Sequence, residues 1–161
     1  MFKLVSVNGQ SMSPTLQNGD RVLAWAPFAR RFFKRGVIVT LSHFHIHLPA
    51  DKQNQPGFRA ATAAIVQEQS ELFIKRLVGL PGDTVRIPLS QLSQLSPHSL
   101  VTVDPQAARR SDELVWHVPA GHVFVRGDGL QSNDSVAWGP IPFEKLDQIV
   151  LCRFPSFQRI P

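Results

Sequence analysis

Short runs in which apolar and polar residues alternate recur along the chain, and turn-forming residues separate them. Alternation with a period of two puts successive side chains on opposite faces, which is typical of a β-strand with one buried face. The pattern therefore predicts a mostly β, antiparallel fold with little helix. The expected strands lie near residues 2–7, 22–26, 36–41, 73–78, 84–87, 115–118, 122–125 and 149–151, and the last of them is expected to close the sheet.

The length of 161 residues fits a single domain over residues 1–161. We assign its core to about residues 1–48, 71–87 and 115–154, where the strand pattern is clear, and read 49–70 and 88–114 as variable insertions. No run approaches the roughly 20 apolar residues that a membrane-spanning helix needs. We therefore expect the encoded chain to be cytoplasmic, or membrane-associated if it is a fragment of an anchored protein.

Ser11 and Lys75 are the residues whose surroundings suggest chemistry. Ser11 lies between a glycine and a proline, so a bend rather than a strand presents its hydroxyl. A serine is a weak nucleophile until a neighbouring base takes its proton. Lys75 follows Phe73 and precedes Leu77 on the same predicted strand face, and an apolar setting disfavours the charged form of a lysine. The pair therefore suggests a Ser/Lys hydrolase.

Several blocks resemble, in the same order, those of the type I signal peptidase family of Ser/Lys endopeptidases. They are GQSMSPTL at 9–16, KRGVIVTL at 34–41, IKRLVGLPGDTV at 74–85 and GHVFVRGDGLQSNDSVAWGPIP at 121–142. The chain is most similar in form to small soluble members without a membrane anchor. The resemblance implies a coiled antiparallel β-barrel with a variable inserted subdomain.

The resemblance also implies roles for individual residues. Ser11 corresponds to the nucleophile, with its backbone N–H in the oxyanion hole, and Lys75 corresponds to the general base. Gly9 stands where some members have a second oxyanion donor, Ser132 falls near a serine that orients the lysine, and Asp134 matches an aspartate that supports the site. The chain departs from the usual pattern in the last block.

These departures affect the segment that follows the strand at 122–125. Gly129 stands where asparagine is usual, and Val136 stands where arginine is usual. The segment 128–134 is one residue shorter than in the family pattern. The assignments of Ser11 and Lys75 do not depend on these positions.

The function implied is a serine endopeptidase that cleaves a leader or signal peptide from a precursor protein, without a cofactor. Such families accept an extended substrate with small residues at the first and third positions before the cut. Two alternatives stay open: a dedicated soluble maturation protease for one partner, of the nickel superoxide dismutase type, and a non-catalytic peptide-binding module. The residues that bind substrate cannot be assigned from the sequence.

A Ser-His-Asp site is a further alternative for the chemistry. His117 or His122 could act with Asp128 or Asp134, but neither histidine has a sequence context that fixes its partner. This arrangement would also leave the Lys75 block unexplained.

The net charge of +5 suits either nucleic acid or an anionic membrane surface. The basic pairs lack the aromatic and glycine signatures of RNA-binding modules, so we expect no nucleic-acid partner. One stretch, 27–34, combines aromatic and basic residues. It is either a loop whose rings cover the core or a peripheral membrane contact made through Phe28, Arg30, Arg31, Phe32 and Phe33.

Three histidines, His43, His45 and His47, alternate along one predicted strand face. Imidazoles at this spacing can share a divalent transition metal. No carboxylate or cysteine lies near them in the sequence, and an exposed polar strand face gives the same pattern. We therefore expect no metal, and the chemistry proposed for Ser11 and Lys75 needs none.

Overall fold

The computed structural model describes residues 1–42, 72–92, 113–130 and 132–160. His43, His45 and His47 lie outside the described residues, as do the predicted insertion at 49–70 and most of that at 88–114. What the sequence predicts for these segments therefore stays a prediction.

Strands dominate the described part of the chain, and its helices are single turns. This confirms the mostly β, antiparallel fold with little helix that the alternating runs predict. In chain order the elements are β1 Phe2–Ser6, β2 Arg21–Trp25, η1 Arg30–Phe32, β3 Ile38–Leu41, β4 Phe73–Gly79, β5 Thr84–Pro88, α2 Leu89–Leu92, β6 Glu113–His117, β7 His122–Arg126, α4 Ser135–Trp138, β8 Ile141–Pro142, η4 Phe143–Lys145 and β9 Leu146–Phe154.

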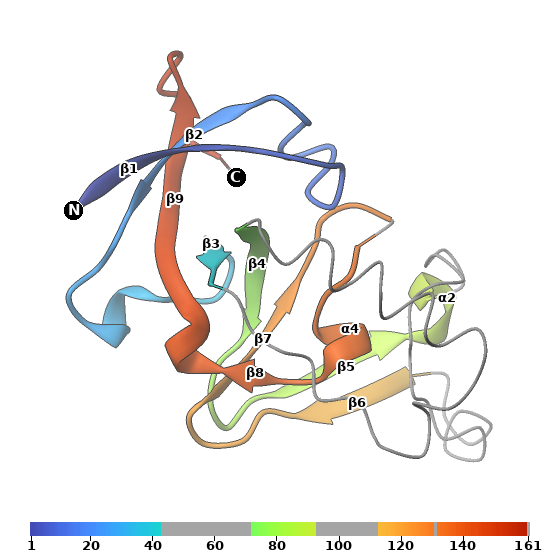
Figure 1. The fold of residues 1–161 in the computed structure, drawn as a ribbon. Helices are drawn as coiled ribbons and strands as arrows, with labels where there is room; N and C mark the ends of the chain where they lie inside the picture. The colour runs from blue at the N-terminus through green and yellow to red at the C-terminus, as the bar shows by residue number, and fades with distance from the viewer. Residues whose placement is uncertain (43–71, 93–112, 131, 161) are drawn as a thin grey trace, which may run out of the picture.

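The main sheet has the strand order β1-β2-β9-β3-β4-β7-β8, while β5 and β6 form a separate two-stranded ribbon (Figure 1). All of these pairings are antiparallel. β9 lies between β2 and β3 in the interior of the sheet. The prediction that residues 149–151 close the sheet is therefore wrong. Consecutive Ile149 and Val150 are both buried, as expected for an interior strand that is covered on both faces.

Irregular pairing bends several strands of the main sheet. The register shifts between Leu23 and Ala24 where β2 meets β9, and between Thr40 and Leu41 where β3 meets β9. A third shift lies between Leu77 and Gly79, where β4 meets β7. Such bulges bend a strand and increase its twist, so the sheet curves around its own side chains.

β4 passes between two clusters of buried hydrophobic side chains. On one face Ile74 packs in a cluster that contains Met12 and Leu16. On the other face Leu77 packs in a cluster that contains Val39 and Val125. Successive strand side chains point to opposite faces, so the two faces of β4 pack in different clusters, while β7 pairs with one of its edges.

An ion pair fixes the turn that follows β4. Arg35 donates from Nε and Nη2 to the carboxylate of Asp83 at 2.6 and 2.5 Å, and the Leu80 N–H donates to the same carboxylate at 2.8 Å. The hydrogen bonds from Arg35 and Leu80 lower the pKa of Asp83 to about 2. The turn before β3 and the turn after β4 are therefore held together.

Candidate active site

Ser11 lies in the turn that connects β1 with β2, and this connection is closed at its base by backbone hydrogen bonds. Val7 N–H donates to the Asp20 carbonyl, and Gly19 N–H donates to the Val7 carbonyl, both at 2.8 Å. Two apolar side chains of the connection, Met12 and Leu16, are 1% and 0% exposed. Ser11, half-buried beside Met12, is thereby fixed to the hydrophobic core.

The predicted bend at Ser11 is confirmed. Ser13 N–H donates to the Gln10 carbonyl at 3.0 Å, and Leu16 N–H donates to the Met12 carbonyl at 2.8 Å. Gly9, assigned to support of the site, lies at the exposed start of this turn, where its N–H donates to Asn18 Oδ1 at 2.9 Å. In the structure Gly9 therefore stabilises the shape of the connection.

Lys75 lies in β4 and is 3% exposed. Its Nζ lies 6.0 Å from the centre of the Phe73 ring, so both side chains point to one strand face, as the alternation predicts. Val39 of β3 is its partner in the sheet. The Lys75 side chain is therefore shielded from water. The position therefore has the apolar setting that a lysine base needs.

The loop after β7 contacts the turn that carries Ser11. Gly129 N–H donates to the Ser11 carbonyl at 2.8 Å. A side chain at Gly127 has no room, because its Cβ would lie 2.1 Å from Ser132 Oγ and 2.3 Å from the Ser11 carbonyl oxygen. In Figure 1 this loop, drawn in orange, runs directly below the blue β1–β2 connection. Ser132 Oγ and the Ser11 carbonyl oxygen therefore both lie against Gly127, on the side where a side chain would project.

Asp134 is 1% exposed and holds this loop by accepting backbone hydrogen bonds. Gly127 N–H donates to its Oδ2 at 2.8 Å, and Val136 N–H donates to its Oδ1 at 3.0 Å, where Asp134 caps helix α4. The residue at position 136 is valine, so this backbone N–H, and not an arginine side chain, meets the carboxylate. Asp134 therefore fixes the shape of the loop after β7, and its supporting role in the site stays a prediction.

Ser132 is 6% exposed. Within the described part of the chain its Oγ has no hydrogen-bond partner. A buried hydroxyl without a partner costs free energy unless it serves another purpose. The role of Ser132 in orienting Lys75 stays a prediction.

Asp128 and Arg76 form a link that the sequence did not reveal. Arg76 donates to Asp128 from Nε at 2.9 Å and from Nη2 at 2.7 Å, and its Nη1 donates to the Gly36 carbonyl at 2.6 Å. Burial raises the pKa of Asp128, but hydrogen bonds from the Arg76 and Thr15 side chains and the charges of Arg76 and Arg126 together lower it below the ordinary value. Asp128 thus joins the loop after β7 to the lysine strand and to the Ser11 turn.

The signal for this link was present in the sequence. Arg76 directly follows Lys75, and Asp128 directly follows Gly127. Arg76 and Asp128 carry opposite charges, but only the pairing of β4 with β7 brings these two residues together. Arg76 and Arg126 are opposite each other in the register of β4 and β7.

The histidines considered for a Ser-His-Asp site have other partners. His117 Nδ1 lies 3.1 Å from Thr84 Oγ1, and His122 Nδ1 lies 3.0 Å from the Ala120 carbonyl oxygen. Asp128 pairs with Arg76, and Asp134 accepts backbone hydrogen bonds. The arrangement therefore gives the histidine alternative no support.

Among the described residues, no group of three or more histidine, cysteine, aspartate or glutamate side chains could hold a metal ion. Cys152 is a buried free cysteine. No helix in the same part of the chain is long and apolar enough to cross a membrane.

The fold is a β protein in which one strand carries a buried lysine and a turn carries a serine. The glycine-containing loop after β7 contacts the serine turn, and β7 pairs with the lysine strand. The chain belongs to the signal peptidase family, peptidase S26, whose pattern it matches over residues 1–154.

Its relatives include proteases from organelles and cyanobacteria. The chain is 31% identical to human mitochondrial inner membrane protease subunit 1, over 87% of this chain and 61% of that protein. It is 31% identical to the probable signal peptidase I-2 of Synechocystis sp., over 96% of this chain and 63% of that protein. It is also 31% identical to mitochondrial ATP-independent inner membrane protease subunit 1b of Arabidopsis thaliana, over 93% of this chain and 68% of that protein. The chain therefore spans about two thirds or less of the length of these relatives.

Replacing Asp128 by asparagine should destabilise the protein. The change removes the charge of a half-buried, doubly hydrogen-bonded ion pair, and we expect the free energy of unfolding to fall by about 2 kcal/mol. Urea unfolding at neutral pH measures it. Glu113→Gln is the control, because Glu113 and Arg86 form an exposed pair at 3.7 Å, and its effect should stay below about 0.5 kcal/mol.

The effect of Asp128→Asn should also depend on pH. The pKa of Asp128 in the folded protein is below its ordinary value of 3.8, so its contribution to stability is fully present above that pH and is lost on further acidification. The difference between wild type and variant should therefore shrink as the pH falls below 3.8. Equal stability of the two proteins at neutral pH would contradict a stabilising role for this ion pair.

Proposed function

We propose that this protein is a serine endopeptidase of the signal peptidase I type, which cleaves a leader or signal peptide from a precursor protein with a Ser11/Lys75 dyad. The observation that carries the proposal is the loop after β7, which contacts the Ser11 turn and continues a strand paired with the Lys75 strand. Nothing in the family description or in the relatives' names favours a maturation protease for one partner or a non-catalytic peptide-binding module.

The register of β4 and β7 supports the proximity of Lys75 to Ser11. Arg76 is opposite Arg126, and Leu77 is opposite Val125. Continued by one residue, this register sets Gly127 opposite Lys75, and residues directly opposite each other share a sheet face. On that face, the place of a Gly127 side chain is filled by Ser132 Oγ and the Ser11 carbonyl. The Lys75 side chain is thus directed to the region that Ser11 and Ser132 share.

In the proposed mechanism, the neutral amine of Lys75 takes the proton of Ser11 Oγ as this oxygen attacks the scissile carbonyl. The backbone N–H of Ser11 stabilises the negative charge that develops on the carbonyl oxygen. The resulting lysine ammonium then gives the proton to the leaving amine, and an acyl-enzyme remains. The same amine takes a proton from a water molecule as this water attacks the ester, and it gives the proton to Ser11 Oγ as the bond to the acyl group breaks. Ser132 Oγ, which is buried, would hydrogen-bond to the amine and orient it.

We also propose a β-barrel architecture and the bounds of its catalytic core. The curvature produced by the bulges supports a coiled antiparallel β-barrel of the signal peptidase type. We assign the single catalytic core to about residues 1–48, 71–87 and 115–154, with variable insertions at about 49–70 and 88–114. Ser11 and Lys75 then come from two separate segments of that core.

Removing either member of the dyad should abolish cleavage without unfolding the protein. We expect Ser11→Ala and Lys75→Met each to lower kcat/KM by at least about 10³-fold, because both the nucleophile and its base are needed in one step. Mass spectrometry of a precursor peptide with alanine at the first and third positions before the cut measures the rate. Ser13→Ala, in the same turn, is the control and should retain activity. Cleavage by purified Lys75→Met at the wild-type rate would contradict the dyad.

The activity should rise with pH. Only the neutral amine accepts the serine proton, and a higher pH increases its population, so kcat/KM should increase between about pH 5 and the pKa of the base. Measuring the same peptide across this range tests the idea. A flat profile from pH 5 to 9 would count against a lysine base.

We further propose a peripheral membrane contact through the aromatic and basic turn around η1. Phe28 is 80% exposed, its ring packs edge-on against Phe32 at 5.1 Å, and the Arg31 guanidinium lies over both rings. Arg30 lies over the Phe143 ring at 4.9 Å. Exposed aromatic rings beside arginines favour the interface of an anionic bilayer.

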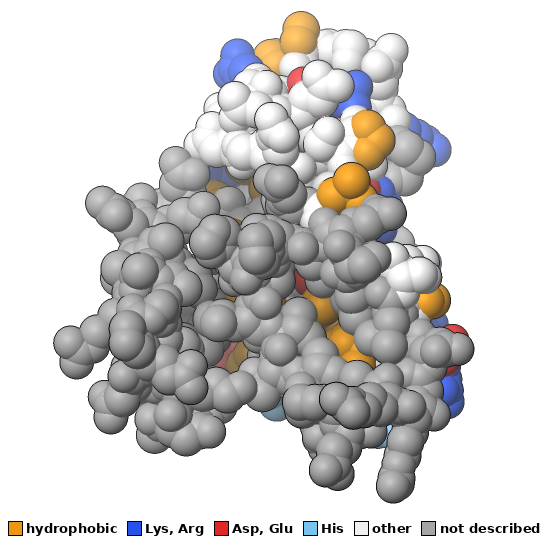
Figure 2. Space-filling view, turned by 90° about the vertical axis from the view of Figure 1, so that its right-hand side faces the viewer, with side chains coloured by type: hydrophobic (Ala, Val, Ile, Leu, Met, Phe, Trp, Pro, Cys, Tyr) orange, Lys and Arg blue, Asp and Glu red, His pale blue; other side chains and the backbone are white. Residues whose placement is uncertain are grey.

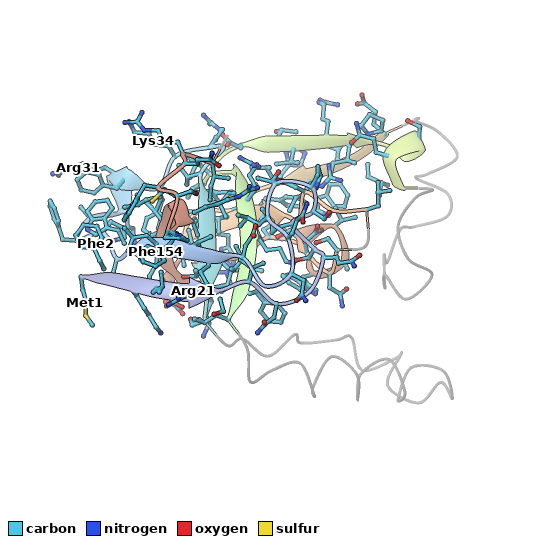
Figure 3. All side chains as sticks on the ribbon, turned by 90° about the horizontal axis from the view of Figure 1, so that it is seen from above. Met1, Phe2, Arg21, Arg31, Lys34 and Phe154 are labelled. Atoms are coloured by element: carbon cyan, nitrogen blue, oxygen red, sulfur yellow. The ribbon has the colours of Figure 1, made fainter. Side chains whose placement is uncertain are left out.

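Phe33 does not belong to this surface. It is 7% exposed and packs edge-on against Phe143 at 5.5 Å, so its inclusion in the predicted contact was wrong. The exposed neighbour is instead Phe2, 63% exposed, whose strand partner is Trp25. Figure 3 shows Met1 and Phe2 at the same end of the molecule as Arg31 and Lys34. Among the described residues visible in Figure 2, the hydrophobic side chains are scattered.

Sedimentation with lipid vesicles tests this contact. We expect binding to vesicles that contain phosphatidylglycerol, weaker binding to pure phosphatidylcholine, and about tenfold weaker partitioning for Phe28→Ala, as the loss of one buried aromatic side chain implies. Phe157→Ala is the control, because Phe157 is equally a surface ring, 61% exposed, that packs on Phe154 instead. Equal partitioning of wild type and Phe28→Ala would contradict the contact.

A further inference from the structure

We propose that Gly129 is a positioning residue that aims the backbone N–H of Ser11. The proposal rests on the proposed function, since it gives this N–H the task of stabilising the oxyanion. It also gives a physical reason for the glycine at a position where the family usually has asparagine.

The contacts of Gly129 with the Ser11 turn are made by backbone atoms alone. Gly129 N–H donates to the Ser11 carbonyl at 2.8 Å. A Cβ at position 129 would lie 2.4 Å from the Gln10 carbonyl oxygen and 3.1 Å from both the carbonyl carbon and the carbonyl oxygen of Ser11. Rotation of a side chain cannot relieve these contacts. Only a residue without a side chain allows the two segments to approach so closely.

The Gln10 carbonyl and the Ser11 N–H belong to one peptide group, which is planar. Whatever fixes the Gln10 oxygen therefore also fixes the direction of the Ser11 N–H. Ser13 N–H donates to this oxygen at 3.0 Å, and Gly129 packs against it. The next peptide group is held as well, because the Ser11 carbonyl accepts from Gly129. Gly129 thus contacts both the peptide group before Ser11 and the peptide group after it.

The loop that contains Gly129 is itself firmly held. Asp128 is fixed by the two hydrogen bonds from Arg76, and Gly127 N–H is fixed by Asp134. An added side chain at position 129 would therefore displace the Ser11 turn. Since oxyanion donors act through their direction, a small displacement should reduce turnover more than binding.

The test is steady-state kinetics of Gly129→Ala with the precursor peptide. We expect kcat to fall about 10²-fold, the size of effect seen when one oxyanion donor is lost, while KM changes less than about threefold because ground-state binding is retained. Leu130→Ala is the matched control: Leu130 is the next residue in the loop, is 64% exposed, and should leave kcat unchanged. Gly129→Asn should be at least as impaired as Gly129→Ala, because its Cβ meets the same backbone oxygen.

The outcomes separate this inference from the proposed function. A wild-type protein without activity, or an active Ser11→Ala, would remove the proposed function. An active wild type with an inactive Ser11→Ala but an unchanged kcat for Gly129→Ala would overturn the positioning role alone, as would a loss confined to KM.

If Gly129→Ala does not fold, the hydrogen-exchange rate of the Gly129 amide in the wild-type protein tests the contact instead. The Gly129 amide should exchange at least about 100-fold more slowly than in an unstructured chain, because its N–H is held by the Ser11 carbonyl. A Gly129 amide that exchanges as freely as an unstructured one would overturn the proposal.

Discussion

Close approach of two backbone segments is the constraint on which the site depends. The Ser11 turn and the loop after β7 meet without intervening side chains, at Gly127 and Gly129. Each segment is anchored separately, the turn by Met12 and Leu16 in the hydrophobic core and the loop by Asp134. Because both anchors are buried, the packing of the sheet determines how the Ser11 turn and the loop after β7 meet.

The buried lysine is the second constraint. Burying a charged amine costs free energy. A lysine can therefore be buried here only if the packing of the surrounding strands offsets this cost. β4 meets this condition, because it pairs with β3 on one edge and β7 on the other and is covered on both faces. Lys75 is thereby shielded from water in the interior of the sheet. The adjacent Arg76 stays charged because Asp128 neutralises it.

The sequence predicted the strands well because their signal is local. Alternation locates a strand and tells which residues share a face, and both held for Phe73 and Lys75. Alternation does not tell which strands become neighbours, so the interior position of β9 was missed. The link between Arg76 and Asp128 was missed for the same reason, since it depends on the pairing of β4 with β7. Phe33 was misplaced because a run of adjacent aromatic residues in a tight turn does not reveal which ring faces inward.

The position of β9 affects the order in which the strands of the main sheet can pair. β2 pairs with β1 and β9, and β3 pairs with β4 and β9, so among the described strands β9 alone joins the half with the Ser11 turn to the half with Lys75. Pairings between residues far apart in the chain form late. The two halves of the sheet can therefore pair into one sheet only after residues 146–154 have been added to the chain. The sheet is therefore continuous between the side of the Ser11 turn and the side of Lys75 only once β9 is in place.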